Sequence, residues 1–223
     1  MFADVPELIA LGLAIAISPL PIAALLLKLM SPDGFRATVG LAAGWFLGVG
    51  ASAAGLSFLS TLLPDHDADA VAPFVAIGSL GLGALLVLTG VVQIRGRTAV
   101  ETTPDLPRWM AVLDRLDPAR AAVIGFGYGA FRPKNLIFAA AAGVVIWRNN
   151  PDPATVVVSV LLFTVVASST MIAPVLAYAF GTRVVRRNLV RLREWILSHV
   201  TLITGVTLVL VGVCLAVFGL LRL

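Results

Sequence analysis

Six long apolar stretches run along the chain, and short segments that contain most of the charged residues separate them. A helix needs about 20 mostly apolar residues to cross the hydrocarbon core of a bilayer. The pattern therefore predicts an all-α polytopic membrane protein that forms a single transmembrane domain over residues 1–223. The six predicted spans are residues 5–29, 37–63, 71–94, 118–147, 154–180 and 200–221.

Composition supports the membrane class. Hydrophobic residues make up 59% of the chain and charged residues 13%, whereas soluble domains average about 45–50% and about 25%. The net charge of +4 does not indicate nucleic-acid binding, because the basic residues lie in the short segments between spans. The single cysteine, Cys214, excludes an intrachain disulfide and a CxxC redox centre.

The distribution of basic residues predicts the orientation in the membrane. The segments after the first, third and fifth spans contain most of them: Lys28, Arg36, Arg95, Arg97, Arg108, Arg115, Arg120, Arg183, Arg186, Arg187, Arg191 and Arg193. The opposite side has Arg148 and Arg222 alone. Under the positive-inside rule, both termini are expected outside the cytoplasm.

Two of the cytoplasmic segments are long. Residues 95–117 form the longest predicted loop. Residues 182–198 place apolar side chains at helical spacing opposite a run of arginines, which predicts an amphipathic helix on the anionic surface of the cytoplasmic leaflet. The alternative is a basic connector that only obeys the positive-inside rule.

Prolines interrupt two of the spans. Pro19 and Pro21 lie half-way along the first span, and Pro133 lies half-way along the fourth. A proline inside a helix removes a hydrogen bond and clashes with the preceding turn. Because three spans separate the two breaks, the pattern predicts two inverted three-helix repeats, residues 1–94 and 118–223, with broken helices 1 and 4. The alternative is two independent proline kinks.

Each break also has the features of a helix start. Ser18 is placed to cap a half-helix that begins at Pro19, and Pro133 is placed to begin another. A helix N-terminus presents unpaired N–H groups and attracts anions. We therefore expect both half-helices to direct their N-termini at the bilayer centre.

Two cations lie at the second break. Arg132 and Lys134 have no acidic partner within any predicted span, and a cation at the centre of a span costs about 2.5–3.5 kcal/mol on insertion scales. Together with the two helix N-termini, they predict a site that an anion completes. The alternative, snorkelling to an interface, requires a reach of about 20 Å from the middle of a long span.

Further polar residues extend the predicted site. Asn135 follows Lys134 and would hold the anion with the two cations, while Ser18, Pro19 and Pro21 would shape the opposite wall. In the fifth span, Ser168, Ser169 and Thr170 form a polar cluster with Thr164. These hydroxyls either line the path or bond to their own helix.

Glycines recur at spacings of three or four in the other spans. They predict close helix packing at Gly40, Gly44, Gly48, Gly78, Gly81, Gly125 and Gly129.

Three segments, "ISPLPIAALLLKLMSPDG", "GLAAGWFLGV" and "GAFRPKNLIFAAAAGVVI", resemble the Gap-like family of actinobacteria, the peptidoglycolipid- and sulfolipid-addressing proteins within the LysE exporter superfamily. Family members usually have Asn at the position of Arg132. The resemblance implies six spans in two inverted halves, often a homodimer, in the bacterial plasma membrane. It also implies export of lipids or glycolipids toward the cell envelope.

The sequence therefore predicts an exporter of an anionic lipid or glycolipid. Two alternatives stay open: a LysE-type exporter of an amino acid or organic anion, and an accessory scaffold of a larger lipid export machinery. The chain has no catalytic constellation and no Walker loop, so we expect no enzyme activity and no cofactor. The acidic residues at 65–69 are of a kind more common in solvated loops than in metal sites.

Overall fold

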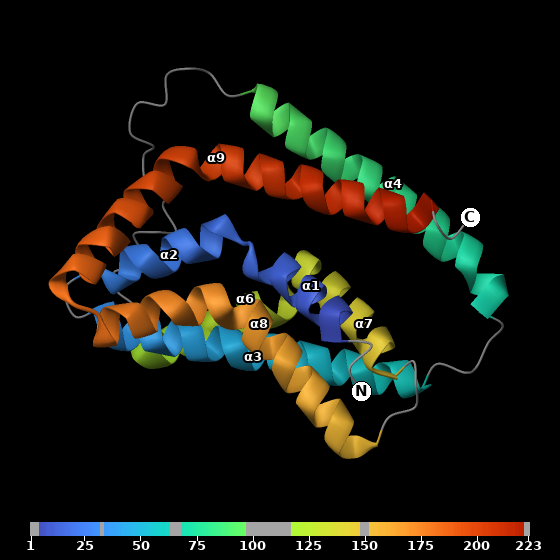
Figure 1. Cartoon of the computed structure of the whole chain (residues 1–223), viewed down its shortest axis with the longest axis horizontal. Coiled ribbons are helices and arrows are strands. Elements are labelled where there is room, and N and C mark those ends of the chain that lie inside the picture. The colour runs from blue at the N-terminus through green and yellow to red at the C-terminus, as the bar shows by residue number, and fades with distance from the viewer. Residues whose placement is uncertain (1–4, 32–33, 63–67, 97–116, 148–151, 221–223) are drawn as a thin grey trace. The chain divides into compact units, whose positions relative to one another are not determined.

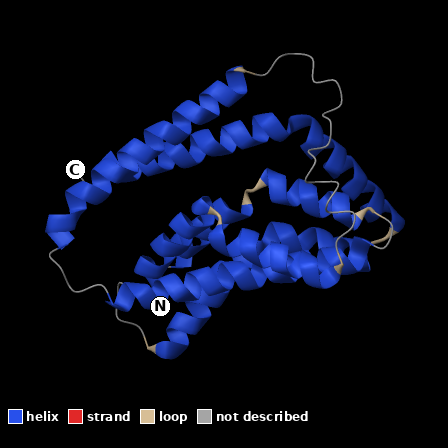
Figure 2. Cartoon of the chain, turned by 180° about the vertical axis from the view of Figure 1, so that it is seen from behind, coloured by secondary structure: helices blue, strands red, loops and turns tan. Residues whose placement is uncertain are grey.

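The computed structural model describes residues 5–31, 34–62, 68–96, 117–147 and 152–220 (Figure 1). Within these residues the secondary structure is entirely helical (Figure 2), which confirms the predicted all-α class. The described helices are α1 (Val5–Ala16), α2 (Pro19–Leu29), α3 (Gly34–Leu62), α4 (Ala68–Arg95), α6 (Pro118–Phe131), α7 (Pro133–Trp147), α8 (Pro153–Phe180) and α9 (Arg183–Leu220).

The helix boundaries follow the predicted spans closely. Helices α1 and α2 together match the first predicted span, and α6 and α7 together match the fourth. Helices α3 and α8 are each long and apolar enough to cross a membrane, and the interrupted pair α1 and α2 and the two parts of α9 raise the number of candidate spans to four. The arrangement of six spans as inverted repeats stays a prediction.

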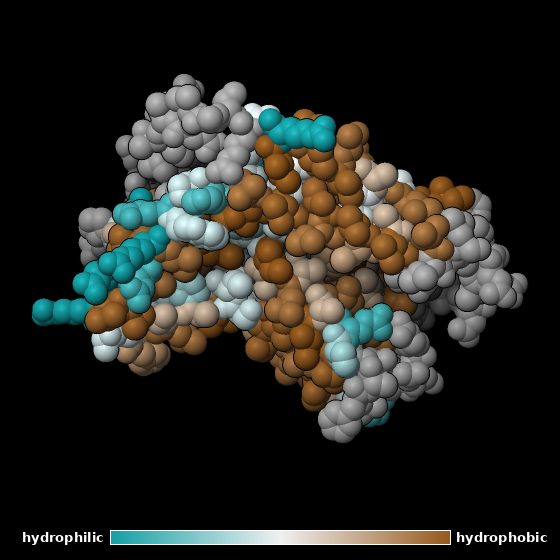
Figure 3. All heavy atoms as spheres, turned by 45° about the horizontal axis from the view of Figure 1, so that its top comes forward, coloured by the Kyte–Doolittle hydropathy of each residue, from teal (hydrophilic) through white to brown (hydrophobic). Residues whose placement is uncertain are grey.

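Large apolar side chains lie exposed on the described helices, and hydrophobic residues cover much of the face in Figure 3. Leu47 and Phe58 of α3 and Val123 and Phe131 of α6 each expose more than half of their surface. A soluble monomer rarely exposes so much contiguous apolar surface. The helices are therefore those of a membrane protein, with these side chains toward the lipid.

The chain forms two compact units, and each draws on both halves of the sequence. The first comprises Met1–Ile17, Pro21–Leu62 and Asp105–Glu194, and the second comprises Ser18–Leu20, Leu63–Pro104 and Trp195–Leu223. In the first unit, α3 packs against α6, α7 and α8, and α1 packs against α7 and α8.

Glycines bring α3 and α6 into backbone contact. A Cβ atom added at Gly44 would collide with the carbonyl of Ala122, and one added at Gly125 would collide with the carbonyl of Leu41. The same holds for the other glycines of this pair, Gly40, Gly48 and Gly129. The predicted close packing is therefore confirmed for this helix pair, where the absence of side chains allows the two backbones to touch.

The second unit has its own glycine contacts, between α4 and the C-terminal part of α9. Gly83 faces the backbone of Gly212, and Gly90 faces that of Gly205, so the two helices run antiparallel. The sequence predicted close packing at Gly81 instead. This prediction is wrong, because an added Cβ at Gly81 meets no described atom within 4 Å. The surroundings of Gly78 lie outside the described residues.

The predicted amphipathic segment is helical and forms the first part of α9, Arg183–Ile196. A bend separates it from the second part, Thr201–Cys214, which lies in the last predicted span. Leu189 and Ile196 are buried on one face. Near its start, the Arg186 guanidinium lies 4.5 Å from the ring centroid of Tyr178, which stacks on Phe35 of α3.

Most of the predicted loop at 95–117 and part of the acidic segment at 65–69 lie outside the described residues. Side-chain caps are present at the starts of α6 and α8. Asp117 accepts from the N–H of Arg120, and Asp152 accepts from those of Ala154 and Thr155, each before a proline. The bond from the Thr155 hydroxyl is the main cause that lowers the pKa of Asp152.

The glycine contact predicts a measurable asymmetry between two substitutions in α3. Gly44→Ala should lower the free energy of unfolding by about 1–3 kcal/mol, the range for overpacking, because its methyl group collides with the α6 backbone. Gly55→Ala is the matched control, since no described atom lies within 4 Å of an added Cβ there. Thermal unfolding in detergent checks this, and equal midpoint temperatures for the two variants would contradict it.

Candidate functional site: the junction of two broken helices

Both predicted breaks are present. Helix α1 ends at Ala16 and α2 begins at Pro19, and the axes of Val5–Ala16 and Pro21–Leu29 differ by 62°. Helix α6 ends at Phe131, Arg132 has extended backbone (φ −69°, ψ 128°), and α7 begins at Pro133. Extended backbone is the conformation that a following proline imposes. Each half-helix therefore begins at a proline, as predicted.

The first break leaves four backbone carbonyls in need of donors. In a continuous helix, the carbonyls of residues 14–17 would accept from the N–H groups of residues 18–21. Pro19 and Pro21 have no N–H group, and the helix has already ended. Within a bilayer such carbonyls must find partners in the protein or in a water-filled cavity.

Side chains from two other helices supply those donors. The Lys134 ammonium of α7 donates to the carbonyls of Ala14 and Ile17, both at 2.8 Å, and lies 3.5 Å from that of Ile15. The Thr170 hydroxyl of α8 donates to the carbonyl of Ala16 at 2.7 Å. All four carbonyls at the end of α1 therefore have a partner.

At the second break, a side chain of the same predicted span supplies the donor for the backbone carbonyls. Pro133 cannot donate to the carbonyl of Gly129, four residues earlier. The Asn135 side-chain amide donates to that carbonyl at 3.0 Å and lies 3.4 Å from the carbonyl of Tyr128. Asn135 is fully buried, and its Oδ1 atom has no partner among the described residues.

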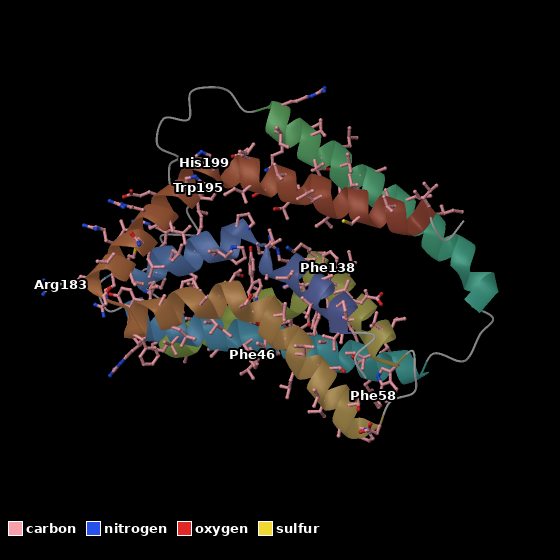
Figure 4. The ribbon with its side chains drawn as sticks, in the orientation of Figure 1. Phe46, Phe58, Phe138, Arg183, Trp195 and His199 are labelled. Carbon is pink, nitrogen blue, oxygen red and sulfur yellow. The ribbon has the colours of Figure 1, made fainter. Side chains whose placement is uncertain are left out.

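Two adjacent residues at the start of α7 therefore bind the ends of two other helices. Lys134 binds the end of α1 and Asn135 the end of α6, and Thr170 adds α8. We call this group, Lys134, Asn135, Thr170 and the carbonyls of residues 14–17, the helix junction. Figure 4 labels Phe138, which is buried one turn beyond Lys134 on α7, beside α1.

Arg132 lies at the edge of the helix junction. It is half-buried, and its guanidinium lies 5.5 Å from the ring centroid of Tyr128, one turn earlier on α6. This distance is within the range of a cation–π contact. Ile17 and Phe131, which flank the two breaks, are 53% and 71% exposed, so apolar surface adjoins the cations.

Lys134 has partners within the protein, because backbone carbonyl oxygens bind its ammonium. The region of the two breaks nevertheless stays positive. Each helix end has a partial charge of about half a unit, and here the negative ends of α1 and α6 oppose the positive starts of α2 and α7. These four contributions cancel, which leaves the formal charge of the two side chains, about +2.

The predicted hydroxyl cluster divides into different roles. The hydroxyls of Thr164 and Ser169 donate to carbonyls of their own helix. Ser168 is fully buried, and its hydroxyl has no partner among the described residues. Within this cluster, it is the Thr170 hydroxyl that donates to another helix, at the carbonyl of Ala16.

The remaining predicted site residues line the first break. Ser18, Pro19 and Pro21 are all buried there. Sequence reasoning missed the carbonyls of residues 14–17 as part of the site. The signal was present, because prolines at 19 and 21 remove the donors for the carbonyls of Ile15 and Ile17. No group of three potential metal-ligating side chains occurs in the described part of the chain.

Comparison with known proteins gives one result. Residues 8–220 match the family model of Sap, the sulfolipid-1-addressing protein. Neither a curated protein nor a solved structure matches the chain. The match includes both breaks and every residue of the helix junction, and the chain therefore belongs to the sulfolipid-1-addressing protein family.

Proposed function

We propose that the protein moves an anionic lipid or glycolipid out of the bacterial plasma membrane toward the envelope, and that it binds the anionic headgroup beside Arg132 and Lys134. The observation that carries this proposal is the positive charge of Lys134 in the helix junction and of Arg132 at its edge, between helices that are broken half-way along two spans. The family name, which refers to a sulfolipid, supports a sulfated headgroup.

The two cations suit an oxyanion for different reasons. A guanidinium presents a planar set of donors that can bind two oxygens of a sulfate, phosphate or carboxylate at once. The Lys134 ammonium has three donors, and one of them makes only the 3.5 Å contact with the carbonyl of Ile15. That distance is at the limit of a hydrogen bond, so this donor is the one an incoming anion can use.

The surroundings favour a lipid over a soluble anion. Exposed apolar side chains flank both breaks, namely Leu13 and Ile17 on the first and Phe131 on the second. Acyl chains can remain in contact with such surface while the headgroup enters the helix junction. The positive charge also opposes the cationic amino acids that LysE relatives export.

The proposed orientation has both termini outside the cytoplasm. The exposed arginines at the start of α9, together with Arg36 in the first turn of α3, would then contact anionic lipids of the cytoplasmic leaflet. A homodimer, or an association with a larger lipid export machinery, is compatible with this orientation. The energy source is a membrane potential, a lipid gradient or such a partner.

Substitution of Arg132 tests the headgroup contact. A hydrogen bond to a charged group contributes about 1.5–3 kcal/mol, so Arg132→Gln should weaken the apparent affinity for the lipid roughly ten- to a hundredfold. Transfer of a labelled anionic lipid between leaflets of proteoliposomes measures this. Arg120→Gln is the control, because Arg120 pairs with Asp117 at the far end of α6. Equal transfer by both variants would refute the headgroup contact.

The lipids that co-purify with the protein provide a test without an added substrate. Mass spectrometry of the purified protein should find an anionic lipid enriched over the bulk membrane composition. Arg132→Ala should lose most of that enrichment, and Arg120→Ala should keep it. A lipid profile that matches the bulk membrane in the parent protein would contradict the proposal.

A further inference from the structure

We propose that an anionic headgroup opens the first break by drawing the Lys134 ammonium away from the carbonyl end of α1. This inference rests on the proposed function and adds the regulation of the same site. Backbone carbonyls bind the Lys134 ammonium in this structure, and the headgroup would bind it in their place.

The contacts at the end of α1 make that exchange possible. The Lys134 ammonium contacts the carbonyls of Ala14, Ile15 and Ile17 at the end of α1, and the Thr170 hydroxyl donates to that of Ala16. Loss of the ammonium therefore removes three contacts between α7 and the end of α1. The rest of α1 packs through apolar side chains such as Leu8 and Ile15.

Charge decides which partner the ammonium prefers. The ammonium is charged with either partner, so its hydrogen bonds are charge-assisted in both cases. A carbonyl oxygen is neutral, whereas a sulfate ester oxygen has a formal negative charge and adds Coulomb attraction to the hydrogen bond. Arg132, the neighbouring cation, would bring the anion within reach of Lys134. A neutral or zwitterionic headgroup offers less net attraction and would leave the carbonyl contacts intact.

The chain has a place where the resulting movement can occur. Ile17 and Ser18 are not helical, and α1 and α2 already differ in direction by 62° at this point. Changes of backbone angle at a few residues between helices are a common hinge. Release of α1 from Lys134 would therefore let α1 pivot about residues 17 and 18 while α7 stays packed on α3.

The experiment measures the distance between α1 and α7 in nanodiscs. Spin labels are placed at Leu13→Cys and Val144→Cys, both exposed positions, in a Cys214→Ala background. Double electron–electron resonance compares phosphatidylcholine discs, the same discs with sulfated galactosylceramide, and phosphatidylcholine discs with soluble sodium sulfate. We expect a second, longer-distance population with the sulfated lipid. The sulfate arm shows whether the free anion alone produces it.

Three variants and one control variant identify the cause of the shift. Lys134→Met should show the longer population in all discs with no response to the sulfated lipid, while Lys134→Arg should keep a response. Thr170→Val should increase the longer population before lipid is added. Thr164→Val, whose hydroxyl bonds within its own helix, should behave as the parent protein does.

Three outcomes overturn the inference, and lipid binding measured in the same discs separates the first two. If the sulfated lipid binds but the distance does not change, the exchange is wrong and the proposed function stands. If the sulfated lipid does not bind, both fail. A parent-like lipid response of Lys134→Met would also overturn the exchange, because α1 would then move without Lys134.

Discussion

Backbone carbonyls inside a bilayer need hydrogen-bond donors, and the arrangement around the two breaks depends on how this chain supplies them. Pro19 and Pro21 remove two of the donors that would continue α1, and Pro133 removes one from α6. Lys134 contacts the carbonyls that Pro19 and Pro21 leave without donors, and Asn135 donates to the one that Pro133 leaves. Thr170 adds a donor for the carbonyl of Ala16. The two proline motifs are thus complementary halves of one site, because one creates unpaired carbonyls and the other provides an ammonium.

The same contacts connect packing to function. Glycines let α6 approach α3 at backbone distance, and Gly143 lets α7 approach α3 at Ser57. The start of α7, which follows α6 directly, contacts both α1 and α6. A lysine is suited to this place because its three donors serve several carbonyls and its charge stays available to an anion. Under the proposed function, the residue that binds the end of α1 would also recognise the substrate.

Much of the fold and of the candidate site could be predicted from the sequence, and the features that could not be predicted have physical reasons. Apolar length predicted the helix boundaries, and proline chemistry predicted both breaks and their first residues. The glycine contacts of α3 and α6 followed from spacing, but those of α4 did not, because spacing does not reveal which face meets a partner. The pairing of Lys134 with α1 was missed, since it joins residues more than a hundred positions apart and the search for partners considered carboxylates only.

The most direct measurement of the contact between the Lys134 ammonium and the end of α1 takes advantage of the small number of lysines in the chain. Lys28 and Lys134 are its only lysines, so ε-¹⁵N-lysine in a Lys28→Arg background gives a single ammonium signal. Solid-state NMR in lipid bilayers can then measure dipolar coupling between this nitrogen and ¹³C-labelled carbonyls of Ala14 and Ile17. The account predicts coupling to both carbonyls without substrate, and its loss on binding an anionic lipid. An ammonium signal without coupling to either carbonyl would contradict the account.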